Sequence, residues 1–332
     1  MQQQNQKGLS RLRLDSIRGQ IIALAILAAL VPALVISLIA YAQSRRALTD
    51  KITQALVTTG SQAAREADVW LKERLYDLRV FANSSIVSET VARRGRPRHL
   101  AEYLNSVRTR FGDYEELQLV DADGGLVASS APHSDPARLP AGWGRSIESS
   151  RSLVGEPYWD RAARKVVVVL GVPVVQGNGR LSGALVARVN FASLTQILRA
   201  FGTRWPGHVY LSSERGSLIA DSREGGDGPE VIRLAPEIAE RLLAAQGKVV
   251  EHRGVDGVEV LGSAQRLSQA AWLAVADLPV EEAYRQATQL RTLALAVIGA
   301  LLLVITSVAY WLATLIAGPL GRLTGAARSE EH

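Results

Sequence analysis

The sequence predicts an α+β fold, in which a long N-terminal helix leads into two copies of an antiparallel-sheet module, with an apolar helix on either side. Three observations support this prediction: two long charge-free apolar segments, an amphipathic stripe after the first of them, and strand patterns that occur twice. The 332 residues carry a formal net charge of +6, but Lys and Arg are interspersed with Asp and Glu. Because no basic stripe forms, we expect no nucleic-acid partner.

The two apolar segments are long enough to cross a membrane as helices. No charged residue occurs from 19 to 44 or from 292 to 321. About 20 apolar residues in a helix span the ~30 Å hydrocarbon layer of a bilayer. We therefore predict membrane helices at 20–42 and 292–317.

The N-terminal tail, residues 1–19, sets the expected orientation, because basic residues beside a membrane helix tend to stay in the cytoplasm. The tail contains Lys7, Arg11, Arg13 and Arg18. Two crossings then return the C-terminus to the cytoplasm and leave the middle of the chain outside. A cleaved signal peptide is the alternative, since Ala40-Tyr41-Ala42 resembles a cleavage site. The apolar stretch, however, is longer than the roughly 7–15 residues of a signal core.

Residues 43–85 are predicted to form one long helix outside the membrane. Apolar side chains recur at spacings of three, four or seven, as on one face of a helix. This stripe consists of Leu48, Ile52, Leu56, Ala63, Ala67, Trp70, Leu71, Leu75, Leu78, Phe81 and Ala82. A helix of this length needs a partner surface, which could be its own domain, a second subunit or both.

Beyond the long helix, the pattern changes to strands and occurs twice. Three pairs of segments recur in the same order, at offsets of 92, 91 and 88 residues: "DGGLVAS" with "RGSLIAD", "VLG" with "VLG", and "ALVARV" with "WLAVAD". Gly177-Asn178-Gly179, between two strand patterns, is the strongest hairpin signal in the chain. We therefore predict two α+β modules of one kind, at 86–200 and 201–285.

Four segments carry a resemblance to a known family: "GEPYWDRAARKVVVVLGVPV", "GALVARVNF", "AWLAVADLPVEEAY" and "IAGPLGRLTGAAR". Together with the long helix and the two apolar segments, they resemble the double Cache receptors. In that family, two tandem PAS-like modules precede the second membrane helix, and a HAMP linker follows it. Pro319, Leu320 and Leu323 are similar to the opening of the first HAMP helix, so residues 318–332 would be a partial HAMP linker that relays the signal.

This resemblance implies a function in signal transduction. The chain would be the extracytoplasmic small-molecule sensor of a receptor in the bacterial inner membrane, homodimeric, with both termini in the cytoplasm. A sensor histidine kinase is the receptor type that we expect, with its output domain beyond this chain. The alternatives are a stand-alone membrane-anchored ligand-binding protein, or the sensor of a chemoreceptor or a nucleotide cyclase.

Catalysis by this chain is not expected. The sequence has no cysteine, no G-x-S-x-G nucleophile elbow and no H-E-x-x-H zinc motif. We expect no catalytic residue, no metal site and no cofactor.

The resemblance also points to a binding site in the membrane-distal module. Amino-acid-sensing members of the family carry an Arg-x-Trp element, a Tyr-x-Asp element and an Asp on the closing strand. Tyr158 and Asp160 match the second element. Trp143 is near the place of the first, but Ala141 stands where its Arg would be, and Arg188 stands nearest to the expected Asp.

Replacing an acid by a guanidinium reverses the charge that the site prefers. We therefore predict a carboxylate or other anion as ligand, held by Arg188 and Arg145, with Tyr158 and Trp143 as walls and Asp160 nearby. The alternative is structural: the aromatic residues belong to the module core, and Arg188 pairs with Asp160 as a bridge.

Overall fold

The computed structural model describes residues 17–93, 97–132, 134–175, 180–202, 205–223, 232–285, 292, 295–308 and 311. Three predictions concern residues outside these ranges: most of the N-terminal tail, the hairpin turn at 177–179, and the relay residues Pro319, Leu320 and Leu323. The chain divides into two compact units. One consists of Met1–Lys51 with Tyr284–His332, and the other is Ile52–Ala283.

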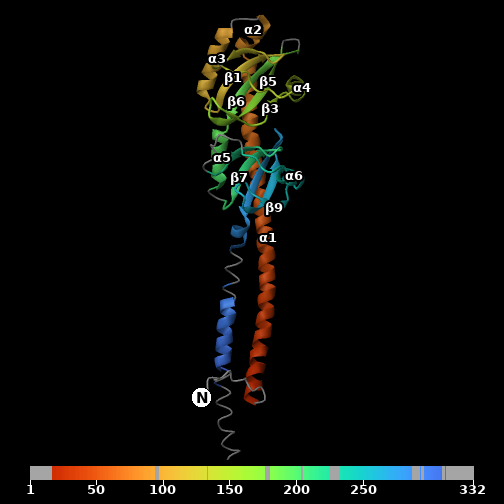
Figure 1. Ribbon diagram of the computed structural model, residues 1–332, viewed down its shortest axis with the longest axis vertical. Coiled ribbons are helices and arrows are strands. Elements are labelled where there is room, and N and C mark those ends of the chain that lie inside the picture. Colours follow the sequence, from red (N-terminus) through yellow and green to blue (C-terminus); the bar gives the residue numbers. More distant parts are fainter. Residues whose placement is uncertain are drawn as a thin grey trace, which may run out of the picture. The chain divides into compact units, whose positions relative to one another are not determined.

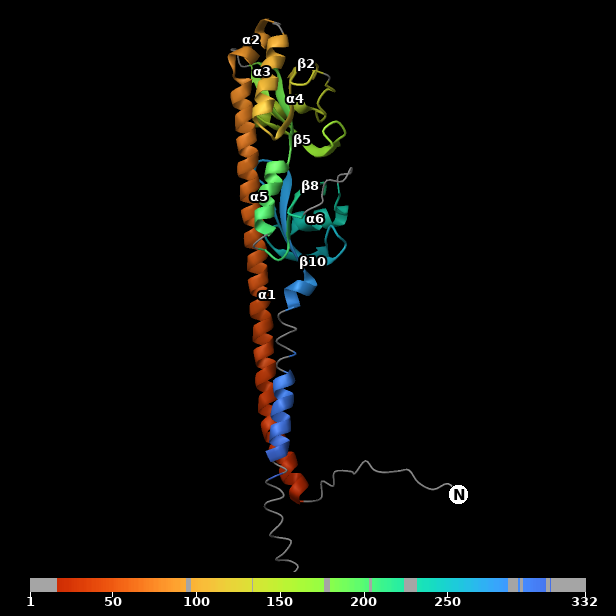
Figure 2. The ribbon, with the colours of Figure 1, turned by 90° about the vertical axis from the view of Figure 1, so that its left-hand side faces the viewer.

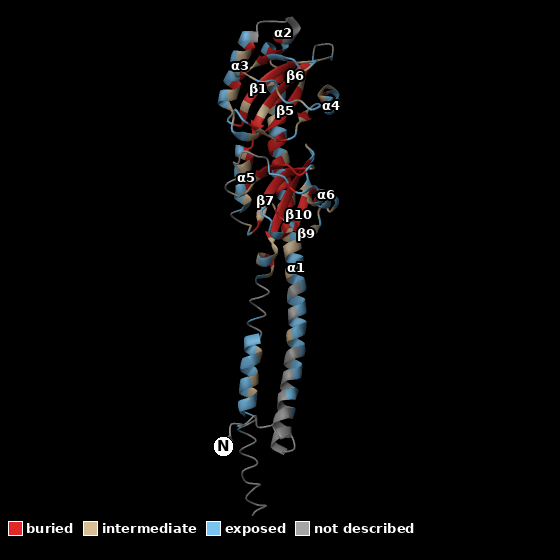
Figure 3. Cartoon of the chain, viewed as in Figure 1, coloured by how far each residue is buried: buried red, intermediate tan, exposed pale blue. Residues whose placement is uncertain are grey.

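The first helix, α1 (Ile17–Ala82), is continuous over 66 residues (Figure 1). From Ile52 on it belongs to the second unit, where one of its faces is buried (Figure 3). The buried side chains include these members of the predicted stripe: Leu56, Ala63, Ala67, Trp70, Leu71, Leu75, Leu78 and Ala82. The hydrophobic periodicity of the sequence thus identified the face of α1 that packs on the rest of the unit.

The first module, as we call the part of the unit from α2 to β6, is built on an antiparallel sheet with the strand order β2-β1-β6-β5-β3. A further short strand, β4, pairs with β5. The strands are β1 (Tyr114–Asp121), β2 (Leu126–Ser129), β3 (Leu153–Val154), β4 (Tyr158–Asp160), β5 (Lys165–Val175) and β6 (Leu181–Asn190).

The second module, which comprises α5 to β11, contains a five-stranded sheet with the order β8-β7-β11-β10-β9. Its strands are β7 (His208–Ser213), β8 (Leu218–Asp221), β9 (Val249–Arg253), β10 (Glu259–Arg266) and β11 (Trp272–Pro279). Each strand has a counterpart at the same place in the first sheet. The prediction of two modules of one α+β kind is confirmed by this shared topology.

Helices shorter than α1 lie against the sheets or, in the case of α2, against α3 (Figures 1 and 2). They are α2 (Ser85–Arg93), α3 (Pro97–Arg110), α4 (Trp143–Ser150), α5 (Ala192–Gly202) and α6 (Pro236–Ala244). α3 packs on β1 and β2, α4 on β3 and β5, and α6 on β9 and β10. α5, the first element of the second module, follows the last strand of the first module and packs on β7 and β8.

Polar contacts fix α1 to both modules. Arg74 donates to Asp113 at the start of β1, with an Nε–Oδ2 distance of 2.9 Å. Six residues earlier on α1, Asp68 accepts hydrogen bonds at 3.0 Å from the backbone N–H groups of Ser268 and Gln269. α1 therefore contacts both modules through charged side chains as well as through its apolar face.

In the described part of the chain, no helix combines the length and the apolarity needed to span a bilayer. The membrane helices expected at 20–42 and 292–317 stay predictions from the sequence.

Candidate functional site

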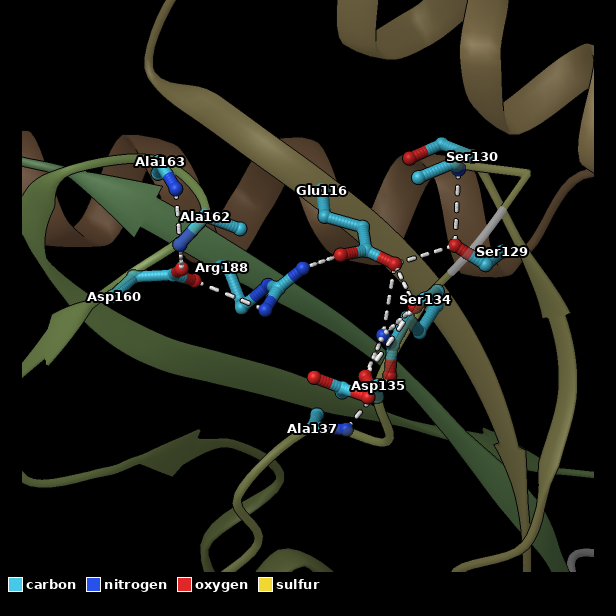
Figure 4. A network of polar contacts seen from close by, with 12 residues as sticks. Glu116, Ser129, Ser130, Ser134, Asp135, Ala137, Asp160, Ala162, Ala163 and Arg188 are labelled. Carbon is cyan, nitrogen blue, oxygen red and sulfur yellow. Dashed lines mark hydrogen bonds and ion pairs between the residues drawn. The ribbon is translucent and has the colours of Figure 1, made fainter.

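Arg188 lies on β6, the central strand of the first sheet, and its guanidinium joins two buried carboxylates (Figure 4). Glu116 on β1 is opposite Arg188 in the strand register and forms an ion pair with it. Asp160 on β4 forms the second ion pair, with an Nη1–Oδ2 distance of 2.9 Å. Glu116 is 1% exposed and Asp160 5% exposed. We call these three residues the ion cluster.

The strand pattern explains why charged residues occur inside this module. Side chains of a strand alternate between the two faces of a sheet, so Glu116 and Gln118 share a face with Arg188 and Val186. The residues between them on β1, such as Leu117, point to the other face and are buried there. One face of the first sheet is therefore apolar, and the other has a polar end.

The Glu116 carboxylate is satisfied by several donors besides Arg188. It accepts hydrogen bonds from Gln118 Nε2 at 2.9 Å and from Ser129 Oγ at 2.5 Å, and a further one from Ser134 Oγ. Removing a carboxylate from water costs several kcal/mol unless donors replace the lost hydration. This dense set of donors accounts for an acid that is almost inaccessible to solvent.

Asp160 holds the turn that joins β4 to β5. Its Oδ1 accepts the backbone N–H of Ala162 at 2.8 Å and that of Ala163 at 3.1 Å, while its Oδ2 faces Arg188. The turn ends at Arg164, whose φ of 53° lies in the left-handed region. Asp160 thus connects the ion cluster to the conformation of this turn.

Burial lowers the pKa of Arg188 from its ordinary value, and the charge of Glu115 opposes this effect. Its Nε atom is buried and has no hydrogen-bond partner among the described residues. The two carboxylates therefore leave one buried N–H of the guanidinium without an acceptor among the described residues.

Tyr158 and Trp143 pack on one apolar cluster of the first module, which includes Val120, Val169 and Val186. Both rings are partly exposed. Arg138 lies over the Tyr158 ring, with its guanidinium carbon 4.7 Å from the ring centroid. Burial, together with the charge of Asp160, raises the pKa of Tyr158 to about 12, so the phenol is neutral and can donate a hydrogen bond.

The structure brings together most of the residues that the sequence singled out. Arg188 and Asp160 form an ion pair, and Tyr158 and Trp143 pack on the same apolar cluster. Arg145 differs, because it is exposed on the first turn of α4 and forms no ion pair with a described residue. A role for any of these residues in binding stays a prediction.

Three neighbours of the predicted site were missed by reasoning from the sequence. Glu116 and Gln118 could have been found, since a polar residue at every second position of a strand indicates a polar face. No sequence pattern indicated Arg138, because this residue lies in a segment without periodicity between β2 and α4.

Comparison with known proteins agrees with this architecture. A family model described as Cache domain matches residues 40–287. The ligand-binding domain of the Pseudomonas fluorescens chemoreceptor CtaA, in complex with L-isoleucine, is 19% identical, with a TM-score of 0.52 over 73% of this chain and 98% of that one. The sensory domain of the Campylobacter jejuni chemoreceptor Tlp3, with isoleucine bound, is 12% identical, with a TM-score of 0.51 over 72% and 96%.

A third structure is the ligand-binding domain of the Pseudomonas aeruginosa chemoreceptor PctB in complex with L-Gln. It is 19% identical, with a TM-score of 0.50 over 73% of this chain and 98% of that one. No curated protein matches the sequence significantly. Because the family match covers well over half of the chain, the protein belongs to the Cache family of sensory ligand-binding domains.

Proposed function

We propose that this chain is the extracytoplasmic sensor of a bacterial transmembrane receptor, and that its first module binds a small organic ligand. The proposal is carried by the ion cluster, in which Arg188 keeps a buried N–H without a partner among the described residues. Tyr158 and Trp143 supply partly exposed aromatic walls in the same module. A few polar groups beside apolar and aromatic side chains are typical of small-molecule sites.

The proposed ligand carries a carboxylate or another anionic group, which would accept the hydrogen bond of Arg188 Nε. The matched chemoreceptor domains hold amino acids, whose ammonium group would need carboxylates of its own. Here Glu116 and Asp160 already pair with Arg188, so an ammonium group would have to compete with the guanidinium for them. This competition counts against the ammonium group of a zwitterion at the ion cluster.

Attachment to the membrane is proposed from the two charge-free segments of the sequence. Large apolar side chains are exposed in the described parts of both segments: Leu24, Leu27, Val31, Val35, Ile36, Leu38, Ile39, Leu295, Val297, Leu301, Leu303, Val304, Val308 and Trp311. Contiguous apolar surface of this kind favours contact with lipid or with another apolar surface.

Membrane topology can be tested by labelling, because the chain has no native cysteine. A Val258→Cys variant places one thiol at an exposed position of the second module. We expect a membrane-impermeant maleimide to label it in cells whose outer envelope has been made permeable. Labelling only after the inner membrane is broken would contradict the proposed topology.

We further propose that the signal travels along α1 and through the second apolar segment to a HAMP linker that begins near Pro319. The contacts of Arg74 and Asp68 with the two modules support a role of α1 in this relay. A ligand can shift two signalling states only by its differential affinity for them, and couplings of about 1–3 kcal/mol are usual. We propose a histidine kinase as the output domain. A chemoreceptor signalling region encoded in frame downstream of this chain would contradict that assignment.

The ligand proposal is tested by calorimetric titration of the full chain in detergent with a panel of carboxylates and amino acids. At least one anionic compound should bind, and Arg188→Lys should weaken its binding tenfold or more, because Lys keeps the charge but loses Nε. Arg110→Lys, at an exposed position of α3, is the matched control and should bind like the wild type. Equal affinity of Arg188→Lys and the control would remove Arg188 from the site.

A further inference from the structure

We propose a second binding site in the cleft between the two modules, for a small molecule with two negative charges. The cleft has a volume of about 410 Å³. It is lined by the β4–β5 turn of the first module together with α5 and β8. The site is separate from the ion cluster and does not depend on the function proposed for it.

The charged residues in the described lining of the cleft are mostly positive. Among the described residues, its lining includes Arg164 and Lys165 from the first module, Arg199 from α5 and Arg223 from the second module, together with one carboxylate, that of Asp221. Cationic groups that converge on one cavity from separate elements repel each other unless an anion lies between them.

Among the described residues, acidic partners are found for two of these four cations. Lys165 pairs with Glu115 at 2.8 Å, and Arg223 pairs with Asp221 at 2.7 Å. Arg164 and Arg199 form no ion pair with any described residue. Two guanidinium groups without acids match a dianion, because each can bind a carboxylate or a phosphate through two parallel hydrogen bonds.

The rest of the lining can enclose a small molecule. Trp159, Ile219 and Ile232 contribute apolar surface from both modules. Pockets of about 300–1,000 Å³ with apolar walls and a few polar groups are the usual size for small ligands. The cleft thus combines suitable volume, apolar walls and two guanidinium groups that form no ion pair with a described acid.

The β4–β5 turn would couple this cleft to the ion cluster. Trp159 lines the cleft, whereas the next residue, Asp160, points to Arg188 on the other side of β4. The backbone hydrogen bonds of Asp160 hold the turn that ends at Arg164. A dianion bound to Arg164 would contact the β4–β5 turn, and a ligand that moves Asp160 would shift the same turn. Binding of either ligand should therefore change the affinity of the chain for the other.

The test is calorimetric titration of the full chain in detergent at constant ionic strength, with inorganic phosphate in one arm and succinate in the other. We expect either phosphate or succinate to bind. Which of the two binds shows whether the cleft takes a phosphate or a dicarboxylate. The double variant Arg164→Asn/Arg199→Gln should lose at least tenfold in affinity for the compound that binds. Asn is chosen at 164 because it tolerates a left-handed backbone.

A control with the same loss of charge makes the outcome decisive. The double variant Arg98→Gln/Arg110→Gln, at exposed positions of α3, should bind the dianion like the wild type, which excludes a general effect of net charge. Failure of both dianions to bind, or equal binding by the wild type and the double variant, would overturn the proposal.

Discussion

Glu116 is 1% exposed, yet its carboxylate is surrounded by the guanidinium of Arg188, the amide of Gln118 and two serine hydroxyls. Its main partner lies 72 residues away on β6, and no local pattern in the sequence links the two. Strand pairing brings them together, because β1 and β6 are neighbours in the sheet.

Glu116→Gln should lower the free energy of unfolding by roughly 3 kcal/mol, because removing one member of a buried ion pair leaves its partner poorly compensated. Glu156→Gln is the matched control, since that side chain is 48% exposed and lies 3.9 Å from Arg215. We expect a change of at most about 0.5 kcal/mol for the control. Urea denaturation of both variants measures the difference, and equal stabilities would contradict this role of Glu116.

Asp277 lies on β11, the strand that corresponds to β6 of the first module, opposite His208 of β7. It is 3% exposed, and burial raises its pKa from 3.8 to about 7. The backbone N–H of His208 and the charge of Arg223 oppose this rise, whereas Asp221 and Asp256 add to it.

This raised pKa predicts a pH-dependent stability. Between about pH 4 and 7, Asp277 is protonated in the folded chain and ionised in the unfolded chain, so rising pH favours unfolding. Relative to Asp277→Asn, the wild type should lose on the order of 4 kcal/mol over this range, at about 1.4 kcal/mol per pH unit. Above pH 7 the difference should be constant. Denaturation curves of both proteins at several pH values check this, and parallel curves from pH 4 to 7 would contradict it.

At the scale of elements, the sequence predicted the long helix and both sheets because their periodic patterns extend over many residues. The predicted stripe matches the buried face of α1, and the repeated segments fall on corresponding strands. β3 and β4 were not predicted as separate strands, since two or three residues are too few to show alternation. The ion cluster was only partly predictable for a related reason, because strand register rather than local pattern pairs Glu116 with Arg188.

Packing of α1 on the sheets is open to a direct test at Leu71, which is fully buried. Leu71→Ala should reduce the free energy of unfolding by about 2–5 kcal/mol, through lost apolar contact and the cavity left behind. Lys72→Ala, one residue further along and exposed, should change it by less than about 0.5 kcal/mol. Similar losses in the two variants would mean that the apolar face does not hold the helix in place.

At the scale of the whole molecule, an exposed face of α1 is the surface at which we expect the homodimer to form. Val69, Tyr76 and Val80 are 52%, 64% and 51% exposed and follow each other at spacings of seven and four residues. This spacing puts them on one side of the helix. An apolar stripe of this kind favours packing against a second copy of the same helix.

Tyr76→Glu should therefore weaken self-association of the full chain, because a charge in the centre of an apolar interface must be desolvated. Sedimentation equilibrium in detergent should show an increase of at least tenfold in the dimer dissociation constant. Val258→Glu introduces the same charge at an exposed position of the second module and should leave association unchanged. A dimer that is equally strong in both variants would exclude this face of α1 from the interface.

Asp68 and Arg74 hold different modules, but they are only six residues apart on one helix. A single residue inserted between them would turn one side chain by about 100° relative to the other and advance it by 1.5 Å along the axis. No such insertion could keep both contacts, whereas loops between strands can change length freely. Related chains should therefore vary in their loops and keep the spacing between these two positions constant.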